Sequence, residues 1–389
     1  MSFDICDSRI LYSGMNRLFL QGITYNDISL APGRATFERG DIDLHTQLSR
    51  NIELDLPIVA SPMDTVTGHR MAIALGQLGG IGFIHRNQPI DIQADEVSKA
   101  AGANVQVGGA VGTYDSDITR ADSLVEAGVS VLLVDSAHGH SEFVIDMTRT
   151  LKQRYPRLDV ISGNIAEARA AEDLEEAGAD GLRVGMGPGA IRTTRVISGM
   201  GVPQVTALQN VSCSELPFIA DGGINHPGDL TKALAFATTV MLGRLLAGTT
   251  ESPGDVIGLT SDKVPARFKS IFEAGQSTRT FKVYRGMGSL GAMAAGKTLN
   301  AGGEFHGKDF STDKLTAEGV EGLVQHTGSL RSVVEKLVEG LKSGMYYTGN
   351  RTLAELRANA QFYHNSHASM VESHPHDMIV TEDGGNYKL

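Results

Sequence analysis

The stretch VGGAVGTYDSDITRADSLVEAGVSVLLVD, residues 107–135, contains the repeating unit of this chain. A short apolar run is followed by a polar turn, by a segment with helical periodicity (118–128) and by a second apolar run that ends at Asp135. Short apolar runs bounded by turn residues are typical of strands buried on both faces, and a helix between two such strands is typical of a parallel sheet.

The same unit recurs on both sides of this stretch. The apolar runs predicted as strands are residues 57–61, 80–84, 106–113, 129–135, 158–162, 181–185, 217–221 and 238–243, and helical patterns occupy residues 118–128, 165–178 and 227–237. Eight strand-then-helix units predict an α/β fold, a parallel (β/α)₈ TIM barrel whose chemistry lies in the loops after the strand carboxyl ends. A doubly wound open sheet is the alternative that the spacing leaves open.

Two regions depart from the repeat. Only eight residues, QNVSCSEL (209–216), separate TAL (206–208) from the seventh predicted strand, so we expect a helix of one or two turns there, with Cys213 as a packing residue. Residues 281–325 show no clear periodicity, which predicts an active-site flap at about 295–325, with a disordered surface excursion as the alternative. A helical pattern at 328–345 and a histidine-rich tail follow, so residues 1–389 are predicted to form one catalytic-type barrel domain.

Composition excludes several classes of protein. The chain has 34 basic and 45 acidic residues, a net charge of −11, which argues against nucleic acid or an anionic membrane as partner. The first residues show no signal-peptide pattern, and no apolar run approaches the ~20 residues that cross a bilayer. The two cysteines, Cys6 and Cys213, are too few for a disulfide framework and suit the cytoplasm. The tail histidines (364–377) lack the spacing of a zinc site.

Glycine-rich motifs follow several predicted strands. ADGGI (220–224) and VMLGRLLAG (240–248) follow the last two strands, where glycine lets backbone N–H groups approach a phosphate. The alternative is that these glycines only permit tight turns. A third motif, RVGMGPGAIRTT (183–194), would wrap a ligand or offer carbonyl groups to a monovalent cation.

Together with these motifs, several others resemble the IMP dehydrogenase/GMP reductase family in identity and order over nearly the whole chain. They are SPMDTV (61–66), GIGFIHRN (80–87), VDSAHGHS (134–141), GN (163–164), YRGMGSLGAM (284–293), EGVEG (318–322) and ESHPHD (372–377). The 284–293 and 372–377 motifs look more like IMP dehydrogenase than GMP reductase. Members of the family often carry a CBS pair near the third strand, but residues 95–112 run straight through, so we expect no CBS module.

The resemblance implies a purine-nucleotide substrate, NAD or NADP as cofactor, a K⁺ ion and a homotetramer. The implied substrate-binding residues are Ser61, Met63, Asp221, Gly222, Gly223, Gly243, Arg244, Tyr284, Gly286, Met287 and Gly288. Asp135, Ser136 and Asn164 are the implied cofactor-binding residues, and Thr194 and Glu318 the pair that activates water or ammonia. The implied K⁺ site consists of Gly185, Gly187 and the carbonyl of Arg192, completed by Glu372, Ser373 and His374 of a neighbouring subunit.

The sequence departs from the family at the centre of its chemistry. Arg192 stands where the family has its nucleophilic cysteine, and a guanidinium stays protonated and cannot attack the purine. Ala190 and Arg244 replace two phosphate-binding serines, and GGEFH (302–306) replaces the flap's Arg-Tyr pair. Neither Cys6 nor Cys213 is expected on a loop that could substitute.

Three functions remain open. One is an NAD(P)-dependent enzyme that acts on a purine nucleotide without a thiol, with Arg192 in the catalytic position and Arg192 and Arg244 suited to bidentate recognition of an anion. The second is a non-catalytic nucleotide binder, either a sensor or a partner subunit. The third is an FMN-dependent barrel, because an arginine after the glycine of the eighth strand also occurs in FMN phosphate sites.

Overall fold

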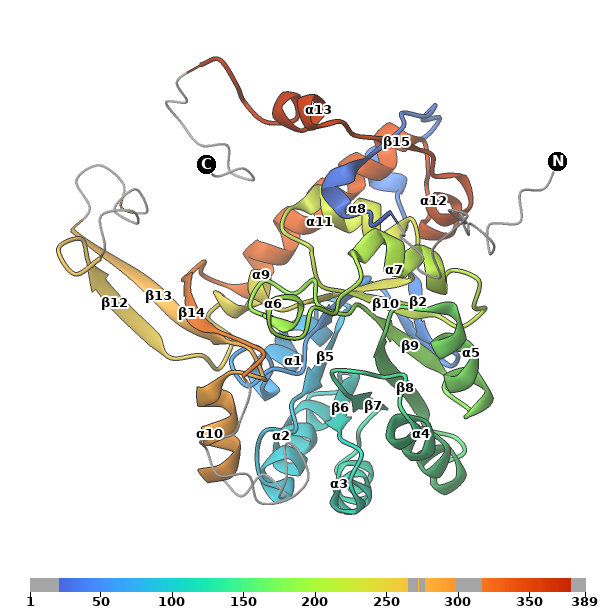
Figure 1. The fold of residues 1–389 in the computed structure, drawn as a ribbon, viewed down its shortest axis with the longest axis vertical. Coiled ribbons are helices and arrows are strands. Elements are labelled where there is room, and N and C mark those ends of the chain that lie inside the picture. The colour runs from blue at the N-terminus through green and yellow to red at the C-terminus, as the bar shows by residue number, and fades with distance from the viewer. Residues whose placement is uncertain (1–20, 265–271, 273–276, 299–316, 379–389) are drawn as a thin grey trace, which may run out of the picture.

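The computed structural model describes residues 21–264, 272, 277–298 and 317–378, and eight of its strands close into a parallel barrel (Figure 1). The order around the barrel follows the chain, and the eighth strand pairs with the first. The closed barrel confirms the (β/α)₈ prediction, so the open-sheet alternative is wrong. The strands are β4 (Ile58–Ala60), β5 (Ile81–Ile84), β6 (Val107–Val111), β7 (Val131–Asp135), β8 (Asp159–Ile165), β9 (Gly181–Val184), β10 (Phe218–Asp221) and β11 (Thr239–Leu242).

Helices surround the strands on the outside of the barrel (Figure 1). The predicted helices correspond to α3 (Asp115–Glu126), α5 (Ala168–Glu176) and α8 (Pro227–Leu234). The others between barrel strands are α1 (His69–Gly76), α2 (Ile90–Gly102), α4 (Glu142–Arg154), α6 (Thr194–Ser198) and α7 (Gln204–Val211). Their apolar faces and the outward side chains of the strands form the larger of two hydrophobic clusters.

The smaller cluster fills the inside of the barrel. It contains inward-facing residues of the strands, such as Phe83 and Leu133, together with Leu48, Ile52 and Leu54 of an antiparallel hairpin. This hairpin, β2 (Thr46–Ser49) and β3 (Ile52–Leu54), closes the amino-terminal end of the barrel. A Cβ atom at Gly108 would lie 2.3 Å from the Phe83 ring, so glycine makes room for the aromatic side chain. The inside of the barrel is therefore a packed core.

α7 has eight residues and ends at Val211, so only its last three residues lie in the short connection (209–216) where a helix of one or two turns was expected. TAL (206–208) lies inside this helix. Cys213 follows the helix, is exposed, and donates from Sγ to the carbonyl of Asn210 at 3.4 Å. The prediction that Cys213 is a packing residue was therefore wrong, because the loop turns outward after α7.

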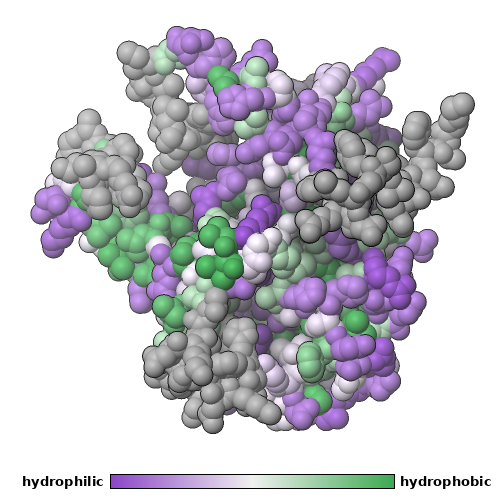
Figure 2. All heavy atoms as spheres, in the orientation of Figure 1, coloured by the Kyte–Doolittle hydropathy of each residue, from purple (hydrophilic) through white to green (hydrophobic). Residues whose placement is uncertain are grey.

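The region after the eighth strand is more regular than expected. α9 (Arg244–Ala247) is followed by an antiparallel sheet of β12 (Val256–Thr260), β13 (Thr278–Arg285) and β14 (Glu321–Gln325). α10 (Leu290–Thr298) lies between β13 and β14 in the chain. The missing periodicity did not indicate a missing structure, because two strands that pair across a long connection do not produce a repeated sequence pattern. Residues 299–316, most of the predicted flap, lie outside the described residues. Figure 2 shows hydrophobic side chains over this sheet, which exposes Val256, Val320 and Leu323.

The carboxyl-terminal part packs on the outside of the barrel. α11 (Leu330–Thr348) confirms the helix predicted at 328–345 and packs against α8. α12 (Leu353–Asn359) follows, and β15 (Phe362–His364) pairs with β1 (Ile28–Leu30). α13 (His367–Glu372) lies beyond them at the edge of the molecule (Figure 1). Among the described residues, no helix combines the length and apolarity needed to cross a membrane.

Candidate functional site

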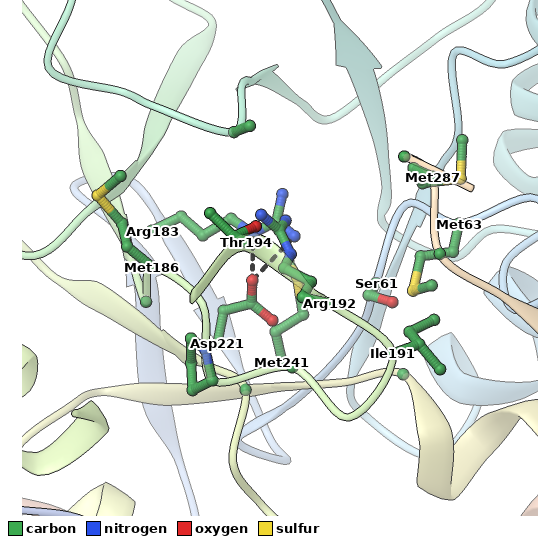
Figure 3. Close-up of a pocket in the computed structure, with 18 of the residues that line it drawn as sticks. Ser61, Met63, Arg183, Met186, Ile191, Arg192, Thr194, Asp221, Met241 and Met287 are labelled. Carbon is green, nitrogen blue, oxygen red and sulfur yellow. Dashed lines mark hydrogen bonds and ion pairs between the residues drawn. The ribbon is translucent and has the colours of Figure 1, made fainter. Parts of the chain in front are cut away.

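A pocket of about 1030 Å³ lies at the carboxyl ends of the barrel strands. In Figure 3 Ser61, Met63 and Met287 lie on one side of it and Arg183 and Met186 on the other. The pocket gathers nearly all the residues predicted from sequence, from loops far apart in the chain. Its lining includes Ser61, Met63, Asp135, Ser136, Gly185, Arg192, Thr194, Asp221, Gly222, Gly223, Gly243, Arg244, Tyr284, Gly286, Met287, Gly288 and Glu318.

The carboxylate of Asp221, at the end of β10, is held by two buried side chains. Asn164 donates from Nδ2 to Oδ2 of Asp221 at 2.8 Å. Arg183 donates from Nε to the same oxygen at 3.1 Å (Figure 3). Arg183 also lies 2.5 Å from Oδ1 of Asp135, so it links the ends of two barrel strands. Asn164 thus lies beneath the pocket as a support for Asp221.

Arg183 was missed by sequence reasoning. It is 4% exposed and projects from β9, between two carboxylates that raise the pKa of its buried guanidinium against the opposing effect of desolvation. The signal was available, because a single charged residue in the otherwise apolar strand GLRVG needs a buried partner. The arginine orients Asp135 and Asp221 toward the pocket in a fixed geometry.

Gly222 and Gly223 turn the chain immediately after Asp221. Their φ angles are +100° and +79°, a region that favours glycine. A Cβ atom at Gly222 would lie 2.8 Å from Cγ of Pro188, in the loop after β9. The turn therefore brings two glycine-rich loops together. Without side chains at these glycines, a ligand can approach the backbone closely.

A small cradle lies beside this turn, at the end of β11. A Cβ atom at Gly243 would meet the hydroxyl of Tyr284 at 3.0 Å, Oγ of Ser61 at 3.2 Å and Sδ of Met63 at 3.3 Å. Oγ of Ser61 is buried and has no hydrogen-bond partner within the described residues. Burial also raises the pKa of Tyr284, so its hydroxyl remains a neutral donor. These groups can receive a polar atom of a ligand.

Arg192 and Arg244 place two positive charges near this cradle. Both charges act on Tyr284, where they oppose the effect of burial on its pKa. Arg244 donates from Nη2 to Oδ1 of Asn225 at 3.1 Å. In the described part of the chain, neither guanidinium has a carboxylate within ion-pair distance, because Asp135 and Asp221 are bonded to Arg183. The two arginines are therefore free to pair with an anionic ligand.

Backbone pairing brings the loop of Arg192 to the segment of Glu318. Arg192 forms an isolated antiparallel bridge with Gly319, and the N–H of Val320 donates to the carbonyl of Ile191 at 3.0 Å. The N–H of Glu318 donates to the carbonyl of Gly288 at 3.2 Å. Thr194, Glu318 and the 286–288 segment thus border the same space, as the sequence predicted.

The second half of the pocket contains residues that the sequence did not single out. Arg86, Tyr114, His138 and Glu167 line it, together with Asp135 and Ser136. Arg86 donates from Nη2 to the carbonyl of Asp135 at 3.3 Å. Arg86 directly precedes Asn87 in the quoted motif GIGFIHRN, so its place after a barrel strand was the signal that could have identified it.

The residues predicted for K⁺ are divided between two places. Gly185 and Arg192 line the pocket, and Gly187 faces Arg195 with φ of +86°. Glu372, Ser373 and His374 are exposed at the end of α13, away from this loop of their own chain (Figure 1). Within the described residues, no three histidine, cysteine or acidic side chains are grouped as metal ligands.

The pocket contains no thiol among its described lining residues. Cys213 precedes β10 at the opposite end of the barrel and does not line this pocket, and Cys6 lies outside the described residues. The arrangement can bind an anion and orient polar groups, and its described lining residues offer no thiol for covalent attack.

Comparison with known proteins agrees with this geometry. A family described as "IMP dehydrogenase / GMP reductase domain" matches residues 22–376. The inosine-5'-monophosphate dehydrogenase of Borreliella burgdorferi is 37% identical, over 94% of this chain and 99% of the relative. Those of Cryptosporidium parvum and Escherichia coli K12 are 36% and 32% identical, over 94% and 96% of this chain and 98% and 100% of the relatives. The chain belongs to the IMP dehydrogenase/GMP reductase family, whose purine-nucleotide oxidoreductase type of barrel it shares.

Proposed function

We propose that this protein binds a purine mononucleotide in the main pocket and, with NAD or NADP, catalyses an oxidoreductase-type reaction on it without a covalent thiol intermediate. The proposal rests on a contrast between Asp221, which Arg183 and Asn164 fix, and the two arginines Arg192 and Arg244, which have no carboxylate partner among the described residues. A fixed carboxylate suits a ribose diol, and two unpaired guanidinium groups suit a phosphate.

Each part of a nucleotide finds a matching part of the pocket. The phosphate would lie at Gly243, Arg244 and Tyr284, where the cradle contains the unpaired hydroxyl of Ser61. The ribose would lie at Asp221, and the purine against the 286–288 segment. Because Arg192 replaces a cysteine and Ala190 a serine, we propose that the anion sits closer to Arg192 than the family's phosphate would.

The chemistry must use groups other than sulfur. Glu318 and Thr194 would position and deprotonate water, and the charge of Arg192 would stabilise negative charge that develops on the purine. These three residues are the proposed catalytic residues.

A nicotinamide cofactor fits the second half of the pocket. At about 1030 Å³ the cavity is at the upper end of ordinary ligand sites, which span about 300–1,000 Å³, so it has room for two ligands. Asp135 and Ser136 would hold the cofactor's polar groups beside the purine, with Arg86 next to them. When bound, NAD or NADP supplies a hydride acceptor or donor.

The missing thiol favours one alternative, a non-catalytic nucleotide binder that acts as a sensor or partner subunit. An FMN-dependent reaction is the third candidate, supported only by Gly243 followed by Arg244.

A thermal-shift panel separates the three candidates. The ligands are IMP, XMP, GMP and AMP, their nucleosides, NAD, NADP and FMN. A ligand at about 100 times its Kd adds about 2.7 kcal/mol to the free energy of unfolding. We expect one monophosphate to stabilise the protein more than its nucleoside does, and turnover of that monophosphate with NAD or NADP.

The other outcomes of the panel are equally informative. Absence of a shift with every monophosphate contradicts the proposal. If the wild type binds a monophosphate without converting it, whereas Arg192→Cys does convert it, the protein is the non-catalytic binder. A shift with FMN together with visible absorbance of the purified protein identifies the flavin enzyme.

We further propose a cytoplasmic homotetramer of single barrel domains that lack a CBS module. The exposed apolar side chains of the β12–β13–β14 sheet support contact between copies. A neighbouring copy would bring Glu372, Ser373 and His374 to the carbonyls of Gly185, Gly187 and Arg192 to bind K⁺. Sedimentation tests the oligomeric state, and we expect a tetramer. Thermal unfolding in K⁺ and in Li⁺ tests the ion site, and we expect greater thermal stability in K⁺.

A further inference from the structure

A second cavity, of about 490 Å³, lies at the opposite end of the barrel from the main pocket. It is bordered by Pro217 and Phe218 at the start of β10 and by Thr238 just before β11. The other side of the cavity is formed by α12 and β15. The main pocket opens at the carboxyl ends of the same two barrel strands, so a ligand in one cavity cannot contact a ligand in the other.

The cavity contains an unpaired positive charge on Arg357, near the end of α12. Its Nη1 atom is buried, and within the described residues it has no hydrogen-bond partner. The described part of the chain also places no carboxylate within ion-pair distance of it, and burial alone lowers the pKa of this guanidinium. A guanidinium nevertheless stays charged in proteins, so a partly buried one without a counter-ion is unfavourable.

The surroundings of Arg357 indicate what would pair with it. Phe236 and Phe362 stack with ring centroids 5.2 Å apart and form an apolar wall. The hydroxyl of Thr238 donates to the carbonyl of Phe218 at 3.1 Å, so it cannot also donate to a ligand. Glu215 borders the cavity but is exposed at its rim. The hydroxyls of Ser212 and Ser214 also donate within the chain, to Gln209 and Glu175. Apart from the exposed amide of Gln47, the guanidinium is therefore the side-chain donor that remains among the described lining residues, and it is the charged one.

We infer that this cavity is a binding site for a small anion with an apolar body, whose oxyanion group, a carboxylate or a phosphate, pairs with Arg357 while the apolar part contacts Phe236 and Phe362. A neutral ligand would leave the charge unpaired, and an inorganic ion would leave the aromatic wall uncovered. The site is independent of the purine-nucleotide pocket and of the function proposed for it.

Calorimetric titration of the full chain with benzoate, phenyl phosphate and neutral benzamide tests the site. We expect benzoate or phenyl phosphate to bind and benzamide to fail. Arg357→Met should weaken that binding about tenfold or more, since a charge-assisted hydrogen bond is lost. Phe236→Leu should weaken it less, and the matched control Arg331→Met, an exposed arginine at the start of α11, should leave it unchanged.

Arg244→Met separates the two cavities, because it alters only the main pocket. If Arg244→Met abolishes the binding of benzoate and phenyl phosphate while Arg357→Met leaves it intact, the anions bind in the barrel mouth and the inference is wrong. The inference is equally contradicted if no anion binds saturably, or if benzamide binds as tightly as benzoate. Nucleotide binding is measured separately by the thermal-shift panel.

Discussion

Arg183 and Asp221 form an ion pair at the mouth of the barrel, with Nη2 of the arginine 3.0 Å from Oδ2 of the aspartate. Since Arg183 also pairs with Asp135, one buried cation is shared by two carboxylates. The consequence extends to the rest of the pocket: Arg192 and Arg244 have no share in these carboxylates and retain their charge for a ligand.

Replacement of Arg183 by methionine should destabilise the protein strongly. Asp135 and Asp221 would lose their shared cation, and removal of one partner of a buried ion pair costs about 3–5 kcal/mol of the free energy of unfolding. Denaturant unfolding measures the change. Arg169→Met, at an exposed arginine, should change stability by less than about 0.5 kcal/mol, and equal effects in the two variants would contradict the structural role of Arg183.

Arg192→Ala should weaken binding of the nucleotide monophosphate identified in the thermal-shift panel. Loss of a hydrogen bond to a charged group costs about 1.5–3 kcal/mol, which is about 10- to 100-fold in Kd. The corresponding nucleoside should bind wild type and variant alike. Unchanged affinity for every anionic ligand would exclude Arg192 from anion recognition.

Gly243→Ala tests the cradle without changing charge. The new Cβ would take the space next to Tyr284 and Ser61, but φ of Gly243 is −110°, so alanine fits the backbone. We expect at least about tenfold weaker binding of the monophosphate, because the added methyl group fills the space that the ligand would use. The thermal midpoint should change far less than in Gly222→Ala, because the neighbours of the new Cβ are side-chain atoms that need to shift by only a few tenths of an ångström. Full affinity in this variant would place the phosphate elsewhere.

Gly222→Ala should be destabilising as well as harmful to binding. Alanine at φ of +100° costs about 1–2 kcal/mol, and its Cβ would also press on Pro188. Gly228→Ala is the matched control in α8, where a Cβ meets nothing within 4 Å and stability should be unchanged or rise by at most about 1 kcal/mol. Similar unfolding midpoints for both variants would refute the role of the turn.

His85 should make stability depend on pH. It is 8% exposed, and burial lowers its pKa to about 4, whereas the unfolded chain binds the proton near pH 6.5. Between these values the unfolded state holds more protons, so stability is full above pH 6.5 and falls by about 3 kcal/mol as the pH drops to 4. Denaturant unfolding across this range should show a shallower slope in His85→Gln, while His376→Gln, at an exposed residue, should retain the wild-type slope.

The sequence predicted the barrel because each of its strands is a local pattern. Runs such as VSVLLVD (129–135) carry their own apolar signal, and the glycines and aspartates that end them mark the edge where ligands bind. The region after β11 was harder, because β13 and β14 are paired across a long connection and neither repeats the βα pattern. Cys213 was misjudged because exposure depends on which way a loop turns.

The sequence by itself determined the eight-stranded barrel and the family, since each depends on residue types in a fixed order. Only the tertiary structure decided which charges meet. Arg183 lies 38 residues from Asp221 and 48 from Asp135, and Arg357 lies against strands more than a hundred residues earlier in the chain. Ion pairing and desolvation depend on distances of a few ångströms in space, and the order of residues along the chain does not specify those distances. The paired and unpaired arginines could therefore be distinguished only in the folded structure.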